Sequence, residues 1–487
     1  MLGEFVLKGK TCTVSFAKKK LTFTDLKSAD TCEVLVKDIL SVEYLEGSCP
    51  SVRLHHVVPH TNKRLRMQVC DLYGSECFCQ CLADEIKNDL KELTRPRRLL
   101  VFVNPKSGHK KGVKIYSSKV APLLQLSGIY TEVIGKFNIS LLQVTERAGQ
   151  PKELLATYDL SLIHGIVSVG GDGMFSECVN GLLGRLQCDS HIDMHDPDSE
   201  IVASKIPIGI VPAGSGNYLV NYIHGTRDVE TAVLKVILGD HHMSNVVSLH
   251  QGRQLTCYAS LLVEFGLIGN MMHDCEKFRW LGPSRYSVVP ISTLARRKRV
   301  DVEIEYMPEE PKKRSPMTTS KYLRQVSLPA SRYSDRFFRH RLFSMPEDYD
   351  SDKKNDWKKI DGRVYGVDTY VVTQKEKEGS LVPRFGDHAL TMWVTDKCSI
   401  GDHVDQLTKL QKAQSGYLNY DFIRTVRASR YRVKLSSTRT TMNANGERHL
   451  DNKFYINADG EAIKLDTPEF EVRLHQCTMP IFGKIDG

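Results

Sequence analysis

Three short loops in the sequence combine glycine and other small residues with a few polar side chains, the composition expected of a phosphate site. They span residues 104–112, 170–173 and 212–217, and each directly follows an apolar run. Small residues let backbone N–H groups approach an anion, and a helix that begins after such a loop points its positive end there. None of the loops is a P-loop or a dinucleotide fingerprint. One such loop is most often an ordinary turn, whereas three together favour phosphate chemistry.

Asp172 is the carboxylate of the second loop, and it is flanked by Gly170, Gly171 and Gly173. A carboxylate in such a turn can cap the following helix, bind a metal or accept a proton, and capping is the commonest of these roles. Glu177 follows about one and a half helical turns later, so it can face the same cleft. The loop alone leaves these alternatives open.

Alternating strands and helices in residues 99–244 would position the three loops. Apolar strands are predicted at 99–103, 166–169 and 206–211, and helices at 111–124, 174–184, from about 218, and at 228–238. This alternation predicts a mostly parallel sheet with helices on its faces, where ligands bind beyond the carboxyl ends of the strands. The predicted fold class of this part is an α/β nucleotide-binding domain.

Residues 1–93 are predicted to form a separate small β domain. Short runs rich in β-branched residues recur along it, at 5–7, 11–16, 21–24, 33–36, 52–58 and 64–70. An amphipathic helix is predicted from about Ser75, with one apolar ridge made of Phe78, Leu82, Ile86 and Leu90 and with Cys81 and Leu93 beside it. Strands closed by one helix are the element order of a pleckstrin-homology domain, although other small β domains share it. A linker containing Pro96 follows.

Residues 245–487 are predicted to be an all-β domain, most simply a sandwich. Strand-like runs lie at 255–263, 300–306, 364–372, 390–394, 431–435 and 470–474. Residues 308–361 are rich in Lys, Arg, Ser, Pro and Asp, and they are predicted to form a long insertion loop without a function of its own.

The whole chain has 487 residues, a net charge of +9 and 13 cysteines. A basic excess suits ATP, an anionic membrane or nucleic acid. The basic run at 296–299 lacks interleaved aromatic residues, which disfavours nucleic acid and leaves docking to anionic lipid as the better use. No apolar run approaches the ~18 residues of a membrane helix, and no signal-peptide core is present. The expected location is the cytoplasm, peripheral at membranes, with reduced thiols.

Several motifs together resemble the catalytic domain shared by diacylglycerol, sphingosine and ceramide kinases. They are N-P-x-S-G at 104–108, G-G-D-G at 170–173 and P-A-G-S-G-N at 212–217, followed by T-E-R-A-G at 145–149, E-K-F-R-W-L-G-P-S-R-Y at 276–286 and D-G-E at 459–461. The resemblance covers most of residues 99–475. It implies ATP-dependent phosphorylation of a lipid hydroxyl, with Mg²⁺ accompanying the ATP.

The resemblance also implies roles for individual residues. Gly170, Gly171, Asp172 and Gly173 are expected to lie at the lipid hydroxyl, with Asp172 as the proton acceptor. The expected nucleotide contacts are Asn104, Pro105, Lys106, Thr145, Glu146, Arg147, Ala148, Gly149, Glu177, Gly214, Ser215, Gly216, Arg279, Arg285, Gly460 and Glu461. Arginines and Mg²⁺ suit phosphoryl transfer, which depends mainly on positioning and charge neutralisation. The metal ligands are left open.

Within the family, three segments resemble the variants of the ceramide branch, namely 119–123, 173–177 and 279–282. That branch also begins with a pleckstrin-homology domain. The expected substrate is therefore ceramide and the product ceramide 1-phosphate. Residues 214–217 are closer to the general family pattern, and no cysteine lies between Cys275 and Cys398, where the ceramide branch has clustered cysteines. A sphingosine or diacylglycerol kinase, or a non-catalytic lipid-sensing relative, remains the alternative.

Met272 bears on the choice of lipid. Sphingosine kinases hold the free amine of their substrate with a carboxylate at about this position, and an ammonium in an apolar cleft needs such a partner. An uncharged Met272 favours an N-acylated substrate, unless Asp274 or Glu264 supplies the charge instead.

Overall fold

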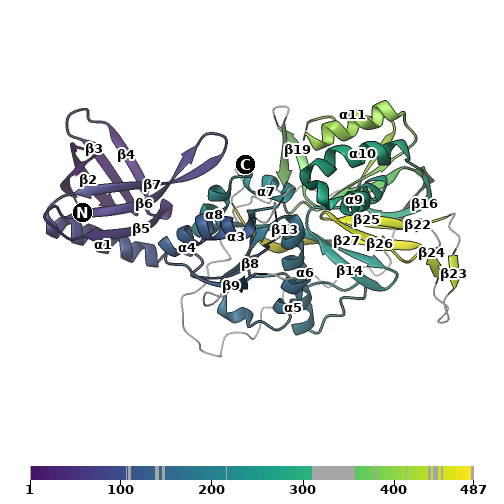
Figure 1. Cartoon of the computed structure of the whole chain (residues 1–487), viewed down its shortest axis with the longest axis horizontal. Coiled ribbons are helices and arrows are strands. Elements are labelled where there is room, and N and C mark those ends of the chain that lie inside the picture. Colours follow the sequence, from purple (N-terminus) through teal and green to yellow (C-terminus); the bar gives the residue numbers. More distant parts are fainter. Residues whose placement is uncertain are drawn as a thin grey trace, which may run out of the picture.

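The computed structural model shows three regions along one elongated molecule (Figure 1), with the N-terminal sheet at one end and the C-terminal strands at the other. The structure describes residues 2–105, 107, 111–137, 142–144, 149–214, 217–309, 357–377, 380–412, 414–436, 440–442, 448–450 and 453–483.

The N-terminal region is a seven-stranded antiparallel sheet in the order β4-β3-β2-β1-β7-β6-β5. The strands are β1 (Leu2–Leu7), β2 (Lys10–Ala17), β3 (Lys20–Asp25), β4 (Thr31–Leu35), β5 (Ile39–Leu45), β6 (Ser51–His60) and β7 (Arg64–Tyr73), with a short 3₁₀ turn η1 (Val36–Asp38). Alternate residues of these strands point inward, and they form one apolar cluster together with the helix α1 (Glu76–Lys91).

The predicted ridge of α1 is confirmed at Leu82 and Ile86 and wrong at Phe78 in the first turn, where Cys79 is the buried residue instead. Cys79, Leu82, Ala83 and Ile86 are buried, and their spacing defines one helix face. Phe78 is 41% exposed and lies instead against Gly3 of β1, whose added Cβ would be 3.1 Å from the Phe78 ring. Cys81 is exposed, whereas Leu90 and Leu93 pack against the core as predicted.

The middle region confirms the predicted α/β alternation. Parallel strands lie in the order β9-β8-β11-β12, with β10 antiparallel at the edge of β9. These strands are β8 (Arg98–Val103), β9 (Tyr130–Phe137), β10 (Leu142–Val144), β11 (Gly165–Gly170) and β12 (Ile208–Pro212). The helical segments are α3 (Gly112–Ile115), a π-helical turn η2 (Tyr116–Val120), α4 (Ala121–Leu126), α5 (Gln150–Leu155), η3 (Leu160–Leu162), α6 (Asp172–Asp189), α7 (Tyr218–His224) and α8 (Val229–Leu238).

The apolar runs of these strands reflect a sheet that is covered on both faces. Along β8, Leu100 and Phe102 join the core beneath α6 and α7, while Leu99, Val101 and Val103 join the core beneath α4 and α8. Strand periodicity thus sends successive side chains into two different cores, so neither face can be polar.

The C-terminal region continues the same sheet. The last strand, β27 (Glu469–Phe482), pairs in parallel with β12 at Ile208 and Ile481, and this pairing makes one 16-stranded sheet. The other strands are β13 (His241–Gln251), β14 (Gln254–Ala259), β15 (Leu262–Gly266), β16 (Val300–Pro308), β17 (Lys358–Val364), β18 (Gly366–Tyr370), β21 (Leu390–Thr395), β22 (Ile423–Leu435), β25 (Phe454–Ala458) and β26 (Glu461–Leu465). Two separate hairpins are β19 (Thr373–Lys377) with β20 (Ser380–Arg384), and β23 (Thr440–Met442) with β24 (Arg448–Leu450).

The prediction that this region is all-β is wrong, because helices α9 (Leu267–Lys277), α10 (Arg285–Ala295) and α11 (Ile400–Gln411) and the 3₁₀ segment η4 (Arg279–Ser284) also belong to it. Gly282, at φ 59°, and Pro290 interrupt the helical periodicity in the sequence. The sandwich itself remains a prediction, since the strands form one continuous path.

The predicted insertion at 308–361 lies mostly outside the described residues. Its flanks are ordered, because β16 and β17 pair antiparallel from Val300–Val364 to Tyr306–Lys358. The insertion therefore joins the two strands of a hairpin, and its last predicted residues are strand. Among the described residues, no helix is long and apolar enough to span a membrane.

Candidate active site

The three glycine-containing loops meet at one edge of the parallel sheet. Val103 is in register with Val169, and Gly170 with Pro212, so the carboxyl ends of β8, β11 and β12 lie side by side. Asn104 N donates to Val169 O at 3.1 Å. The sequence placed the loops after strands, and the sheet order makes them neighbours.

The backbones of the second and third loops are in direct contact. Ala213 N and Gly214 N donate to Gly170 O at 2.9 and 3.1 Å. A Cβ on Gly214 would lie 2.5 Å from Gly171 Cα, a distance that no side chain could occupy. Asn217, at φ 51°, closes the turn through hydrogen bonds of 3.1 and 2.7 Å with Gly214. Gly214 is therefore required for packing, whether or not a ligand is bound.

Asp172 caps a helix, but not the helix that it begins. Its Oδ2 accepts from Tyr218 N at 2.8 Å and its Oδ1 from Leu219 N at 3.2 Å, so it satisfies the first N–H groups of α7. Burial raises the pKa of Asp172 to about 6, against the lowering effect of these two N–H groups, with Asp459 raising it further and Arg227 lowering it. The group is thus a carboxylate at neutral pH with a pKa close to that pH.

Asp459 and Gly460 form the two-residue turn of the β25–β26 hairpin, with φ of 51° and 90°. An Asp-Gly pair between two strands is the signature of such a turn, and this signal was present in the sequence. The Asp459 carboxylate is buried and accepts backbone N–H bonds from Ser260, Leu261 and Leu262 at 2.7–3.0 Å. Burial raises its pKa. It anchors the β14–β15 connection near Asp172.

Glu177 is where three motifs of the sequence converge. Gly149, the last residue of T-E-R-A-G, donates its N–H to Glu177 Oε2 at 3.0 Å. Burial raises the pKa of Glu177, the Gly149 N–H lowers it, and the carboxylate of Glu461 raises it. Glu461 itself is exposed. The two carboxylates, Glu177 and Glu461, therefore lie near enough to repel each other, and the described residues contain no group of three or more His, Cys, Asp or Glu placed to hold a metal ion.

Arg285 lies in the first turn of α10, and its side chain is 13% exposed. Its Nη2 donates to the Tyr286 hydroxyl at 2.6 Å and lies 3.7 Å from Glu276. The Arg285 Nε is buried without a hydrogen-bond partner among the described residues. Tyr286 and Asp172 both act electrostatically on Tyr218, so α10 approaches the Asp172 loop.

Other predicted residues cannot be placed as fully. Lys106, Thr145, Glu146, Arg147, Ala148, Ser215 and Gly216 lie outside the described residues, and only the backbone of Arg279, in η4, is described. Pro105 follows Asn104 in the first loop. A Cβ on Gly112 would lie 2.1 Å from Asn104 O, so this glycine, which sequence reasoning did not single out, lets α3 begin against the loop.

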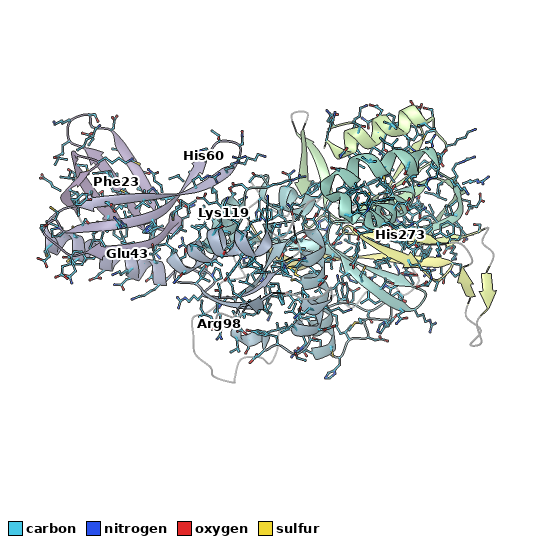
Figure 2. The ribbon with its side chains drawn as sticks, in the orientation of Figure 1. Phe23, Glu43, His60, Arg98, Lys119 and His273 are labelled. Carbon is cyan, nitrogen blue, oxygen red and sulfur yellow. The ribbon has the colours of Figure 1, made fainter. Side chains whose placement is uncertain are left out.

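Helix α9 packs on the β25–β26 hairpin and links this site to the C-terminal region. His273, labelled in Figure 2, stacks on Tyr455 with ring centroids 3.5 Å apart. Gly269 permits the close approach, since its Cβ would be 2.1 Å from Tyr455 O.

Comparison with known proteins shows which sequences and folds this chain is similar to. Residues 98–249 match the diacylglycerol kinase catalytic domain. The chain is 28% identical to a ceramide kinase from Homo sapiens over 94% of this chain and 89% of that protein. It is also 35% identical to a ceramide kinase from Mus musculus, in an alignment that covers 58% of this chain and 54% of that protein. A solved diacylglycerol kinase from Bacillus anthracis str. Sterne is 13% identical, with a TM-score of 0.46 over 80% of this chain and 98% of that one.

A parallel sheet with phosphate-type loops at its carboxyl edge, within a matched kinase domain, defines an ATP-dependent lipid kinase. Residues 98–249 thus match a diacylglycerol kinase catalytic domain, and most of the chain is similar in sequence to ceramide kinases.

Proposed function

We propose that this chain transfers the γ-phosphate of ATP to the primary hydroxyl of ceramide, forming ceramide 1-phosphate, with Asp172 as the general base. The observation that carries the proposal is the place of Asp172, held by α7 where the two glycine loops touch. Each carboxylate oxygen accepts one N–H and keeps a lone pair for the proton of the alcohol. As the new O–P bond forms, that proton passes to Asp172, and ADP leaves.

The remaining residues of the site are proposed to bind the nucleotide. The unpartnered Nε of Arg285 fits a phosphate oxygen, because a guanidinium pairs well with phosphate. Glu177 and Glu461 would hold Mg²⁺, directly or through water, and the ion would supply charge neutralisation at the phosphates. Gly149 donates its N–H to Glu177 and Gly460 precedes Glu461, so both offer backbone without a side chain beside these carboxylates.

The charge states of residues in and near α9 support an N-acylated substrate. Met272, in α9, carries no charge. Asp274 is already engaged, at 3.2 Å from Lys277 Nζ and 3.1 Å from Thr293 Oγ1. Glu264 is buried and hydrogen-bonded to Asn457. Burial raises the pKa of Glu264, against the lowering effect of the Asn457 hydrogen bond and with Asp459 raising it further, so this group is a poor partner for an ammonium.

We therefore expect kcat/KM for ceramide to exceed that for sphingosine by at least ~10-fold, because an unpaired ammonium is costly to bury. The measurement compares ceramide, sphingosine and diacylglycerol at equal mole fraction in the same mixed micelles. Met272→Asp should raise the use of sphingosine, and Met271→Asp serves as the matched control. Equal or better use of sphingosine by the wild type would refute the assignment of ceramide as the substrate. Only the broader assignment as a lipid kinase would then remain.

Membrane contact is proposed to occur through the face formed by η4, α10 and α11. Trp280, Ile291 and Val288 are 77, 70 and 58% exposed, and Phe278, Ile400 and Val404 are exposed as well. The side chain of Arg296, at the end of α10, is 72% exposed. Arg297 turns inward and donates to Cys398 O at 2.8 Å, and this hydrogen bond connects the end of α10 to the residues just before α11. An apolar face beside basic residues suits the surface of an anionic bilayer.

This surface gives a second expectation. Trp280→Ser combined with Ile291→Ser should reduce binding to phosphatidylcholine–phosphatidylserine vesicles by about tenfold or more, since each apolar side chain contributes ~1.5–3 kcal/mol when fully buried. Leu162→Ser, at an exposed apolar site in the middle region, is the control. Vesicle flotation measures binding, and unchanged flotation of the double variant would exclude this face.

The N-terminal sheet and α1 are proposed to be a pleckstrin-homology-like domain that assists this docking. Lys19 and Lys20 pair with Glu92 and Glu33 at 2.7 and 2.6 Å, so they are weaker headgroup candidates than the face just described. The proposed location is the cytoplasm, peripheral at membranes, and no nucleic-acid partner is proposed.

A further inference from the structure

The hairpin of β6 and β7 reaches from the N-terminal sheet to the first turn of α8. Leu65 N donates to Thr231 Oγ1 and Met67 N to Glu230 Oε1, both at 2.9 Å. Strand β7 pairs with β1 only at its far end, near Tyr73, so these N–H groups lie on an otherwise open strand edge. Side chains of α8 satisfy them, as a neighbouring strand would elsewhere.

Arg66, between these two residues, forms a bidentate ion pair with Asp228. Its Nη1 and Nη2 lie 2.6 and 3.1 Å from the two carboxylate oxygens. Asp228 also caps α8 by accepting Thr231 N at 2.9 Å. Burial alone would raise the pKa of Asp228, but the bonds from Arg66 and Thr231 lower it to about 2. The pair is therefore charged at any physiological pH.

The linker holds the other end of α8. Gly239, which ends this helix at φ 81°, lies against Thr94 and Pro96, with its Cβ position 3.1 Å from Thr94 O and from Pro96 Cδ. Arg95 turns back to the N-terminal sheet and donates to Ile39 O at 2.6 Å. Leu40 and Val57 of that sheet join the core beneath α8. The N-terminal region and the linker thus contact α8 at both of its ends.

The segment between α7 and α8 connects these contacts on α8 to the loop that contains Asp172. The Arg227 guanidinium, next to Asp228, lies 5.5 Å from the centre of the Tyr218 ring. Tyr218 begins α7 and donates its N–H to Asp172. Gly225 ends α7, and a Cβ added to it would lie 3.1 Å from the side chain of Lys63. Lys63 is near the tip of the β6–β7 hairpin, where Figure 2 labels His60.

We propose that the Arg66–Asp228 ion pair is a positioning contact for catalysis, by which the N-terminal region fixes the α7–α8 connection and so holds α7 against Asp172. The hydrogen-bond partners of Arg66 and Asp228 all lie outside the three glycine-containing loops. They act through residues 217–228. The inference deepens the proposed function, since its catalytic consequence rests on Asp172 being the base.

The test uses the full chain in detergent–ceramide mixed micelles, where membrane targeting has no part. Arg66→Met is expected to lower kcat by about tenfold with little change in the KM for ATP, since small misplacements at a reacting centre cost up to ~10²-fold. Arg66→Lys should restore part of the loss. Arg64→Met, at an exposed arginine of the same strand, is the matched control.

Two further measurements separate this inference from a general loss of stability. Asp228→Asn keeps a capping side chain but loses the charge, so the Arg66→Met/Asp228→Asn double variant should be no slower than either single variant. Amide hydrogen exchange of residues 217–224 should be faster in Arg66→Met than in Arg64→Met. Unchanged exchange in this segment, or multiplicative effects on kcat, would overturn the proposal. The exchange result decides it even if the wild type fails to phosphorylate ceramide.

Discussion

Asp172→Asn is expected to lower kcat for lipid phosphorylation by ~10²–10⁴-fold, the usual cost of losing a general base. The asparagine keeps the size of the side chain and still accepts one N–H from the first turn of α7. Removing a half-buried charge should offset the loss of the second hydrogen bond, so the thermal unfolding temperature should change little. The loss would therefore be chemical rather than structural.

The pH dependence of kcat provides the accompanying measurement. Asp172 must be ionised to accept a proton, and its pKa is raised to about 6, chiefly by burial. Wild-type kcat should therefore fall as the pH drops through about 6, and Asp172→Asn should lack this limb. Asp189→Asn, at the far end of α6, is the control. A variant that retains kcat within a few-fold of wild type would remove Asp172 from the role of base.

Gly214→Ala is expected to abolish most activity, because its Cβ would lie 2.5 Å from Gly171 Cα. The obstacle is backbone, so one of the two glycine loops must move. Movement of about 1 Å at a reacting centre can cost ~10²-fold in rate. Overpacking of this kind typically destabilises a protein by ~1–3 kcal/mol. We expect both effects, measured as kcat in mixed micelles and as the free energy of unfolding in urea.

Gly184→Ala is the matched control for this substitution. Gly184 lies inside α6, and its added Cβ would meet nothing within 4 Å. Alanine has a higher helix propensity than glycine, so this variant should be as active as wild type and slightly more stable. If Gly214→Ala behaves like Gly184→Ala, the close contact between the loops does not govern catalysis.

The sequence alone determined the α/β core and the places of its loops. Strands β8, β11 and β12 are apolar at nearly every position because helices cover both faces of their sheet. Gly214 follows β12 because the third loop must touch the second loop there. Both signals are local, since each residue is constrained by its own strand or turn, and such signals can be read from one chain.

The turn at Asp459 and Gly460 also had a local signal, whereas the helices α9 and α10 were hidden. Gly282 breaks the segment η4 between these helices, Pro290 lies inside α10, and apolar residues such as Trp280 of η4 and Ile291 of α10 are exposed instead of buried. An amphipathic pattern predicts a helix only when its apolar face meets the core. Here that assumption fails, which is consistent with a surface that meets another apolar phase.

Only the tertiary structure decided which distant groups meet. In the tertiary structure, Glu177 accepts a hydrogen bond from Gly149, and β27 pairs with β12. Asp172 accepts hydrogen bonds from the first N–H groups of α7 rather than from those of its own helix. The tertiary structure also places Arg66 of the N-terminal sheet on Asp228. The partners in these contacts lie far apart in the chain, and side-chain periodicity carries information about burial but none about which partner a buried or capped group will find.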